Sequence, residues 1–437
     1  MKDTGKTAAF HTLGCKVNQY DAQAMMEQFQ QAGYTVRPFG EAVDVNVVVT
    51  CVVTAAGEQK SRQMLHKVRR EQPDSHLIAA GCLAQKDADK LRDLGARVIL
   101  GSRHRDSVVR LLEEALAEGT QVSAVEDIRR VPYEELRISR QEGRTRAVMK
   151  IQEGCDRFCA YCIIPLVRGG IRSRAPEDIR KEAQRLVDAG YQEIVLTGIH
   201  LSSYGKDLDN TGLMDAVRAA AVPGLARLRL GSLEPVVATL AFVRELAGVP
   251  VVCPQFHLSL QSGSDSVLAR MRRRYTTREY LLAARRLMAA FPGCALTTDV
   301  LVGFPGESEE EFQETLAFCR QVGFAKMHIF PFSRRAGTAA DRMPGQLSRA
   351  VKAERAGRMA QLDLELGQAF REAMLGSTQP VLFETAQENS LVQGHTPNLM
   401  AVWAKGATPG RILPVRLDEL HQEGFLGSLT AQDQAGG

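Results

Sequence analysis

A short run of cysteines constrains this chain more than any other feature. Cys155, Cys159 and Cys162 are separated by three and then by two residues. A loop with this spacing can aim three thiolates at one point, and thiolates are the usual ligands of iron-sulfur clusters. A four-iron cube with three protein ligands keeps one iron open to bind a small molecule. A structural zinc site is the alternative, but it requires a fourth Cys or His nearby, and the next candidate, His200, lies far along the chain.

Three more cysteines come soon after predicted buried strands in the first part of the chain. Helical patterns at Ala22–Ala32 and Gln59–Glu71 alternate with these strands, which predicts a doubly wound parallel sheet. In such a sheet the carboxyl ends of the strands share one edge, where ligands bind. The strands and their cysteines are Ala8–Leu13 with Cys15, Val45–Thr50 with Cys51, and Leu77–Ala80 with Cys82.

These three cysteines therefore form a candidate second iron-sulfur site. Taken singly, each is better explained as a small buried hydrophobic residue, and a lone zinc site is the other alternative. Taken together, their common position after a strand favours a second cluster. Cys253, Cys294 and Cys319 have no such arrangement and are interpreted as packing residues.

The alternation of strand and helix repeats six times between residues 146 and 335, which predicts an incomplete parallel β/α barrel. Barrel enzymes act at the carboxyl ends of their strands, and here those ends carry the cysteine loop, glycines and polar residues. The predicted strands are Ala147–Gln152, Glu193–Thr197, Arg227–Gly231, Phe256–Leu260, Leu296–Val302 and Lys326–Phe330.

Two groups of arginines lie close to this predicted site in the sequence. Arg168, Arg172 and Arg174 follow the cysteine loop, so contact with a phosphate or a cofactor carboxylate is weighed against a structural role. The second group, Arg270, Arg272, Arg273 and Arg274, ends a predicted helix and is expected to complement its C-terminus.

The last part of the chain changes in pattern. A long amphipathic helix is predicted at Arg349–Met374, with a solvated basic face or RNA contact as its two interpretations. Five short strands then predict a small closed β-barrel, a shape that often holds nucleic acid. The expected organisation is an N-terminal α/β domain at 1–125, a linker at 126–145 with a solvated run of arginines, a central barrel at 146–372, and a terminal β-barrel at 373–437.

Composition limits the classes of protein to which the chain can belong. The net charge of +4 permits nucleic-acid binding without demanding it. No apolar run approaches the roughly 20 residues that cross a bilayer, so we expect no membrane contact. Nine cysteines in a chain without a predicted leader favour a reducing, cytoplasmic location and roles as ligands.

The cysteine loop resembles the cluster motif of radical S-adenosylmethionine (SAM) enzymes, and its combination with Cys15, Cys51 and Cys82 resembles the methylthiotransferase family. Further stretches are similar to the branch that modifies threonylcarbamoyladenosine in tRNA, and the terminal barrel resembles a TRAM domain, with Leu399 where that domain often has an aromatic residue. The similar stretches are Thr12–Asp21, Leu196–Gly205, His257–Gly263 and Thr298–Glu307.

The resemblance implies two [4Fe-4S] clusters, one on each cysteine triad, and S-adenosylmethionine as cofactor. A 5′-deoxyadenosyl radical would activate C2 of the adenosine, and a methylated sulfur from the second cluster would be coupled there, with a second S-adenosylmethionine as methyl donor. The resemblance also implies cofactor contacts at Tyr161, Gly198, Gln261 and Gly303. The implied partners are the anticodon stem-loop of tRNA and an electron donor such as flavodoxin or ferredoxin. No catalytic side chain is identified, since the cofactor, rather than a side chain, performs the difficult chemical step.

Two other functions remain open at this point. The same chemistry on another tRNA adenosine or on a ribosomal protein side chain would change only the substrate. A non-catalytic RNA-binding protein with structural metal clusters would retain both triads without the reaction.

Overall fold

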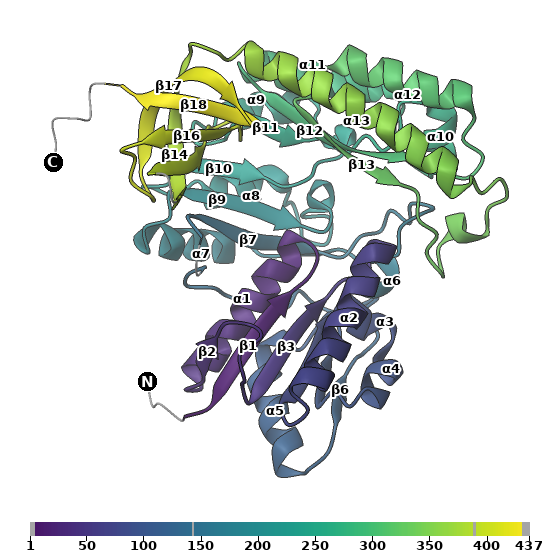
Figure 1. Cartoon of the computed structure of the whole chain (residues 1–437), viewed down its shortest axis with the longest axis vertical. Helices are drawn as coiled ribbons and strands as arrows, with labels where there is room; N and C mark the ends of the chain where they lie inside the picture. Colours follow the sequence, from purple (N-terminus) through teal and green to yellow (C-terminus); the bar gives the residue numbers. More distant parts are fainter. Residues whose placement is uncertain (1–4, 142–143, 388–389, 431–437) are drawn as a thin grey trace.

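The computed structural model describes residues 5–141, 144–387 and 390–430. It contains an all-parallel N-terminal sheet, an open central barrel and a closed terminal barrel, which confirms the predicted fold class (Figure 1).

The N-terminal sheet has the strand order β2-β1-β3-β4-β5-β6. Helices cover both faces because the strands alternate apolar side chains between two cores: α1 and α5 pack on one face, and α2, α3 and α4 on the other. Its elements are β1 (Thr7–Thr12), α1 (Lys16–Gln31), β2 (Thr35–Arg37), β3 (Val45–Thr50), α2 (Ala55–Glu71), β4 (His76–Gly81), α3 (Cys82–Lys86), α4 (Ala88–Asp93), β5 (Val98–Leu100), η1 (Arg105–Ser107), α5 (Val108–Ala117) and β6 (Val122–Ala124).

The segment expected to be a linker joins the two α/β parts without forming a helix or strand in its described residues. Its arginines at 129, 130, 137 and 140 are exposed, as expected for a solvated run of charge. Between them, however, Ile128, Leu136 and Ile138 are buried. These apolar side chains therefore anchor the segment against the rest of the protein. The sequence did not indicate this packing, because it shows no helical periodicity there.

The central part forms an open barrel of six parallel strands. Strand β9 lies between β7 and β10 and pairs with both, strands β11, β12 and β13 form the other half, and backbone bonds such as Leu228 N to Val251 O and Leu233 N to His257 O join the halves. The six strands are β7 (Arg146–Glu153), β9 (Glu193–Gly198), β10 (Arg227–Leu230), β11 (Gln255–His257), β12 (Ala295–Val302) and β13 (Lys326–Pro331), and a short strand β8 (Arg172–Ser173) pairs antiparallel with the end of β7.

Helices cover the outside of this barrel and build one large core with it. Helix α1 of the N-terminal part joins this core through Tyr20 and Ala24, so the two parts share apolar packing. The helices are α6 (Ile164–Arg168), α7 (Pro176–Asp188), η2 (Leu201–Ser203), α8 (Leu213–Ala220), η3 (Pro235–Val237), α9 (Leu240–Ala247), α10 (Asp265–Arg270), α11 (Thr277–Ala290), α12 (Glu309–Val322), η4 (Ala339–Arg342) and α13 (Arg349–Glu372).

The terminal barrel packs against the amino ends of the central strands. Arg227 donates to the carbonyls of His395 and Pro380, and Arg146 pairs with Glu384 at 3.1 Å. Because β7 alone spans about 25 Å, the terminal barrel lies at the opposite end of the central barrel from the cysteine loop. Its strands are β14 (Thr378–Ala386), β15 (Leu391–His395), β16 (Ala401–Lys405), β17 (Ile412–His421) and β18 (Gly424–Leu429).

Candidate active site

The cysteine loop at 155–162 leaves the carboxyl end of β7 through a glycine that no other residue could replace without rearrangement. Gly154 has a φ of +72°, and a Cβ there would lie 1.7 Å from the carbonyl oxygen of Gly170. The Cys155 amide donates to the Gly169 carbonyl at 3.0 Å, and the Cys162 amide donates to the Cys159 carbonyl at 3.0 Å. These bonds fold the loop back on itself and keep its three thiols on one side of the barrel mouth.

Burial and one arginine set the electrostatics of this loop. Burial raises the pKa of Cys155 to about 11 and that of Cys162 to about 12. Arg273 donates to the Cys159 sulfur at 3.3 Å. The Arg273 guanidinium would offset the negative charge of thiolate ligands, and the thiolate is the form of cysteine that binds iron, so this loop fits a thiolate-bound cluster.

Arg273 was expected to complement a helix end, and its contact with Cys159 corrects that expectation. It pairs with Glu234 at 3.0 Å, and Glu234 also meets His200 and Arg157, each at 3.1 Å. Burial raises the pKa of Glu234, but the His200 hydrogen bond and the two guanidiniums outweigh it and hold the pKa at about 2. His200 therefore orients the Glu234 carboxylate, which supports the loop. The only sign of this role in the sequence was the position of His200 after a strand.

The N-terminal cysteines come together at the carboxyl edge of three neighbouring strands. Cys15 precedes α1, Cys51 follows β3, and Cys82 is the first residue of α3. Gly14 has a φ of +101°, and a Cβ there would lie 2.8 Å from the Cys51 sulfur, so only glycine admits this approach. Burial raises the pKa of Cys51 to about 11, and the thiols of Cys82 and Cys15 add to the rise.

Of the arginines that follow the cysteine loop, Arg168 lies at the N-terminal triad rather than at the central one. Arg168 is fully buried and donates through Nε to the Cys82 sulfur at 3.2 Å. It also pairs with Asp21 at 3.2 Å and contacts Glu153 and Asn18. Because α6 begins just after Cys162 and ends at Arg168, this short helix links the two triads.

Of the two roles weighed for these arginines, their contacts favour the structural one. Arg172 donates to the carbonyls of Ile128 and Arg168. Arg174 pairs with Glu182 at 2.8 Å. All three guanidiniums are buried and engaged with groups of the protein itself.

The structure gathers the N-terminal thiols at one edge of a sheet and the central thiols in one loop. Across residues 5–141, 144–387 and 390–430, no group of three His, Cys, Asp or Glu side chains has the spacing of a single metal-ion site. An iron-sulfur cluster does not require that spacing, because each cysteine binds a different iron. Cys253, Cys294 and Cys319 are buried elsewhere, as expected of packing residues.

A cavity of about 1010 Å³, which we call the central cavity, opens between the cysteine loop and the start of α2. Gln261 lines it with a φ of +70°, a left-handed conformation that non-glycine residues rarely adopt and that often marks functional sites. The lining residues are Val53, Thr54, Ala55, Ala56, Tyr161, Gln261, Asp299, Leu301, Phe330, Pro331, Phe332, Ser333, Arg334, Arg335, Arg349, Lys352 and Ala353.

Two of the four predicted cofactor contacts, Tyr161 and Gln261, thus line the central cavity, and Gly198 and Gly303 are not part of that lining. Gly198 lies against Gln152, where a Cβ would come within 2.9 Å of its side chain. Gly303, with a φ of +72°, lies under Lys352, where a Cβ would be 2.5 Å from Cγ. Both glycines permit close packing, and Gly303 does so beside the cavity, since Lys352 lines it.

No helix in the described parts of the chain is both long enough and apolar enough to span a bilayer.

Comparisons with known proteins agree with this geometry. The Radical SAM superfamily matches residues 149–319, and the family described as Uncharacterized protein family UPF0004 matches residues 7–101. A structure of the radical SAM methyltransferase TsrM from Kitasatospora setae, with cobalamin and a [4Fe-4S] cluster bound, superposes with a TM-score of 0.55 at 14% identity. It covers 77% of this chain and 74% of that one, and supports the fold alone.

Relatives of known name match nearly the whole chain. Threonylcarbamoyladenosine tRNA methylthiotransferase MtaB of Bacillus subtilis (strain 168) is 39% identical over 94% of this chain and 93% of its own length. MtaB of Thermotoga maritima is 35% identical over 96% of both. A tRNA-2-methylthio-N(6)-dimethylallyladenosine synthase of Moorella thermoacetica is 36% identical over 95% of this chain and 97% of its own length. The cofactors are accordingly [4Fe-4S] clusters and S-adenosylmethionine. The chain belongs to the radical SAM methylthiotransferases that act on tRNA, in the MtaB branch.

Proposed function

We propose that this methylthiotransferase adds a methylthio group to C2 of N6-threonylcarbamoyladenosine next to the anticodon of tRNA. The assignment of this substrate rests on the positive charge of the central cavity. Arg334, Arg335, Arg349 and Lys352 line it, and Asp299 is the acidic residue of the lining. A threonylcarbamoyl group ends in a carboxylate, which such a lining attracts, whereas a dimethylallyl group is apolar and gains nothing from it.

We further propose that each triad holds one cluster. Cys155, Cys159 and Cys162 would hold the cluster that binds S-adenosylmethionine and supplies the electron for its cleavage, and Cys15, Cys51 and Cys82 would hold the one that carries the sulfur. Two S-adenosylmethionine molecules would be consumed, one for the radical and one as methyl donor. An external reductant of the flavodoxin or ferredoxin class would supply the electron.

The residues of the chain itself position the reactants. Tyr161 and Gln261 lie on the barrel side of the central cavity, and Val53 to Ala56, directly after Cys51, lie on the other side. A base in this cavity would stand between the two triads. Gly198 and Gly303 are proposed to let the backbone approach the cofactor. Each expected domain has one role in this proposal. The domain at 1–125 would hold the sulfur-carrying cluster, and the domain at 146–372 would carry out the radical chemistry. The domain at 373–437 would provide a site for RNA at the far end.

The test is the nucleoside profile of tRNA from a host that lacks this gene. We expect 2-methylthio-N6-threonylcarbamoyladenosine to disappear, to return with the parent gene, and to fall at least tenfold with Arg349→Met in the central cavity. The 2-methylthio derivative of N6-dimethylallyladenosine, measured in the same tRNA preparation, serves as the internal control and should not change. An unchanged threonylcarbamoyladenosine profile in the deletion strain would refute the substrate.

A further inference from the structure

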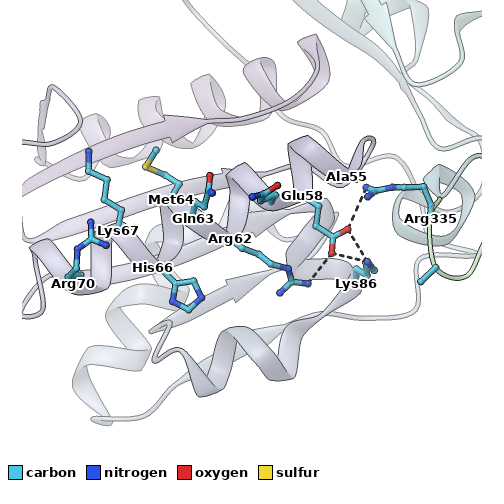
Figure 2. A pocket seen from close by; sticks show the side chains of 12 residues that line it. Ala55, Glu58, Arg62, Gln63, Met64, His66, Lys67, Arg70, Lys86 and Arg335 are labelled. Carbon is cyan, nitrogen blue, oxygen red and sulfur yellow. Dashed lines mark hydrogen bonds and ion pairs between the residues drawn. The ribbon is translucent and has the colours of Figure 1, made fainter. Parts of the chain in front are cut away.

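A second hollow, of about 790 Å³, lies along the outer side of α2 and is rich in cations (Figure 2). Glu58 is its acidic residue and already meets Arg62 and Lys86 at 3.0 Å and Arg335 at 3.5 Å. Positive charge therefore remains in excess. We call this surface the α2 basic face; it consists of Gln59, Arg62, Gln63, His66, Lys67, Arg70, Lys86 and Arg335.

The open part of the face forms one stripe on the helix. Gln59, Gln63, Lys67 and Arg70 are exposed at helical spacing, so they point to the same side. From Gln59 to Arg70 the stripe is about 16 Å long, more than a single small anion needs. Lys67 and Arg70 share Glu71 as a partner, at 3.8 and 2.9 Å, and keep 47% and 71% of their side chains exposed. Such surface pairs are weak, so both cations can exchange this partner for a ligand.

The stripe leads into the central cavity. Ala55 and Arg335 line both hollows, and in Figure 2 Arg335 reaches across from another segment towards Glu58 at the start of α2. Arg334, Arg349 and Lys352 continue the positive charge on the cavity side. A polyanion that enters the cavity would thus pass over a line of cations and glutamines.

The terminal barrel cannot supply these contacts, because it packs at the amino ends of the central strands, at the other end of the barrel. RNA that reaches the central cavity needs phosphate contacts close to the cavity itself. Lysine, arginine and glutamine are the side chains that usually make them.

We propose that the α2 basic face binds the phosphate backbone of the tRNA strand that flanks the reacting nucleotide, while the base of that nucleotide enters the central cavity. This inference rests on the proposed tRNA substrate and adds the surface that guides it.

The test measures binding of a synthetic anticodon stem-loop RNA that contains N6-threonylcarbamoyladenosine to the cluster-loaded protein at several salt concentrations. In Lys67→Gln/Arg70→Gln we expect about tenfold weaker binding at 0.1 M salt, and a slope of log K against log salt that is smaller in magnitude by about 1.4 to 1.8, since each of the two lost phosphate contacts removes roughly 0.7 to 0.9. The matched control is Arg110→Gln/Lys181→Gln. It removes the same charge from two exposed residues that each pair with an acid on their own helix, and it should bind like the parent.

Iron content and melting temperature show whether the variants fold. If the double variant does not, Gln63→Glu replaces it, since it adds a negative charge to the middle of the stripe without breaking an ion pair, and it should also weaken binding. An unchanged salt slope in the folded variant would overturn the inference. The inference would also be overturned if the variant lost turnover only when a flavodoxin-type protein served as reductant, while its RNA affinity stayed unchanged. The face would then be assigned to binding of that acidic protein. The binding assay requires no catalysis, so its failure is distinct from failure of the nucleoside test.

Discussion

At the scale of single residues, Arg168 connects the two halves of the site. Its guanidinium is buried with the carboxylates of Asp21 and Glu153 and with the Cys82 thiol. Removing one partner of a buried ion pair leaves an uncompensated charge and costs about 3 to 5 kcal/mol.

Arg168→Met should therefore destabilise the protein by about 3 kcal/mol, equivalent to a fall in melting temperature of roughly 3 °C for a chain of this length. The control is Arg129→Met, which removes an arginine that is 83% exposed and paired with Asp127 at the surface; its melting temperature should equal that of the parent, because exposed ion pairs contribute little to stability. Equal melting temperatures for the two variants would show that the buried network is not important for stability.

The same residue shows how far sequence alone reaches. The six cysteines could be assigned to two groups because each follows a strand or lies in one short loop. The arginines could not be assigned to a group, because a long side chain reaches a partner chosen by tertiary packing. Arg168, adjacent in sequence to the central triad, contacts Cys82, and Arg273, predicted at a helix end, contacts Cys159.

At the scale of elements, the N-terminus of α12 is tied to α10 by Glu311. This carboxylate accepts bonds from Arg270 at 2.6 Å and from the Ser308 amide at 2.9 Å. The Arg270 hydrogen bond is the main reason that its pKa falls to about 2, from 4.5 for a free glutamate. A pKa that is lower in the folded state gives stability that is present above pH 4.5 and is lost as the pH falls towards 2.

Glu311→Gln should thus cost about 1 kcal/mol at pH 7, after allowance for solvent screening of a partly exposed pair, and nothing near pH 2. The melting temperatures of parent and variant, followed from pH 7 to pH 3, should converge. Glu314→Gln, exposed on the same helix, should show no such convergence. A difference between parent and Glu311→Gln that is independent of pH would mean that the carboxylate charge is not the stabilising feature.

Elements were predicted best where their pattern is long. The six central strands and the five terminal strands follow runs of apolar or alternating residues, and all appear in the structure. Strands β2, β5 and β6 were missed because each has three residues, too few for periodicity to appear. The packed segment at 126–145 was missed because its buried residues, Ile128, Leu136 and Ile138, belong to no regular helix.

At the scale of the whole molecule, the two triads belong to separate sheets and have separate cationic partners. Cys82 meets Arg168, and Cys159 meets Arg273. Helix α6 joins them, but no thiol of one triad is needed to build the loop of the other. The sites should therefore load independently, although a base in the central cavity needs both.

Iron and acid-labile sulfide per chain, measured after anaerobic reconstitution, test this independence. The parent should hold two four-iron clusters, and alanine at all of Cys155, Cys159 and Cys162 should leave one. Alanine at Cys15, Cys51 and Cys82 should also leave one, with cleavage of S-adenosylmethionine retained and sulfur insertion lost. Cys294→Ala, a buried cysteine elsewhere, should keep both clusters. If the parent holds a single cluster that vanishes only in the 155–162 variant, the N-terminal cysteines are packing residues, and the sulfur must come from another site.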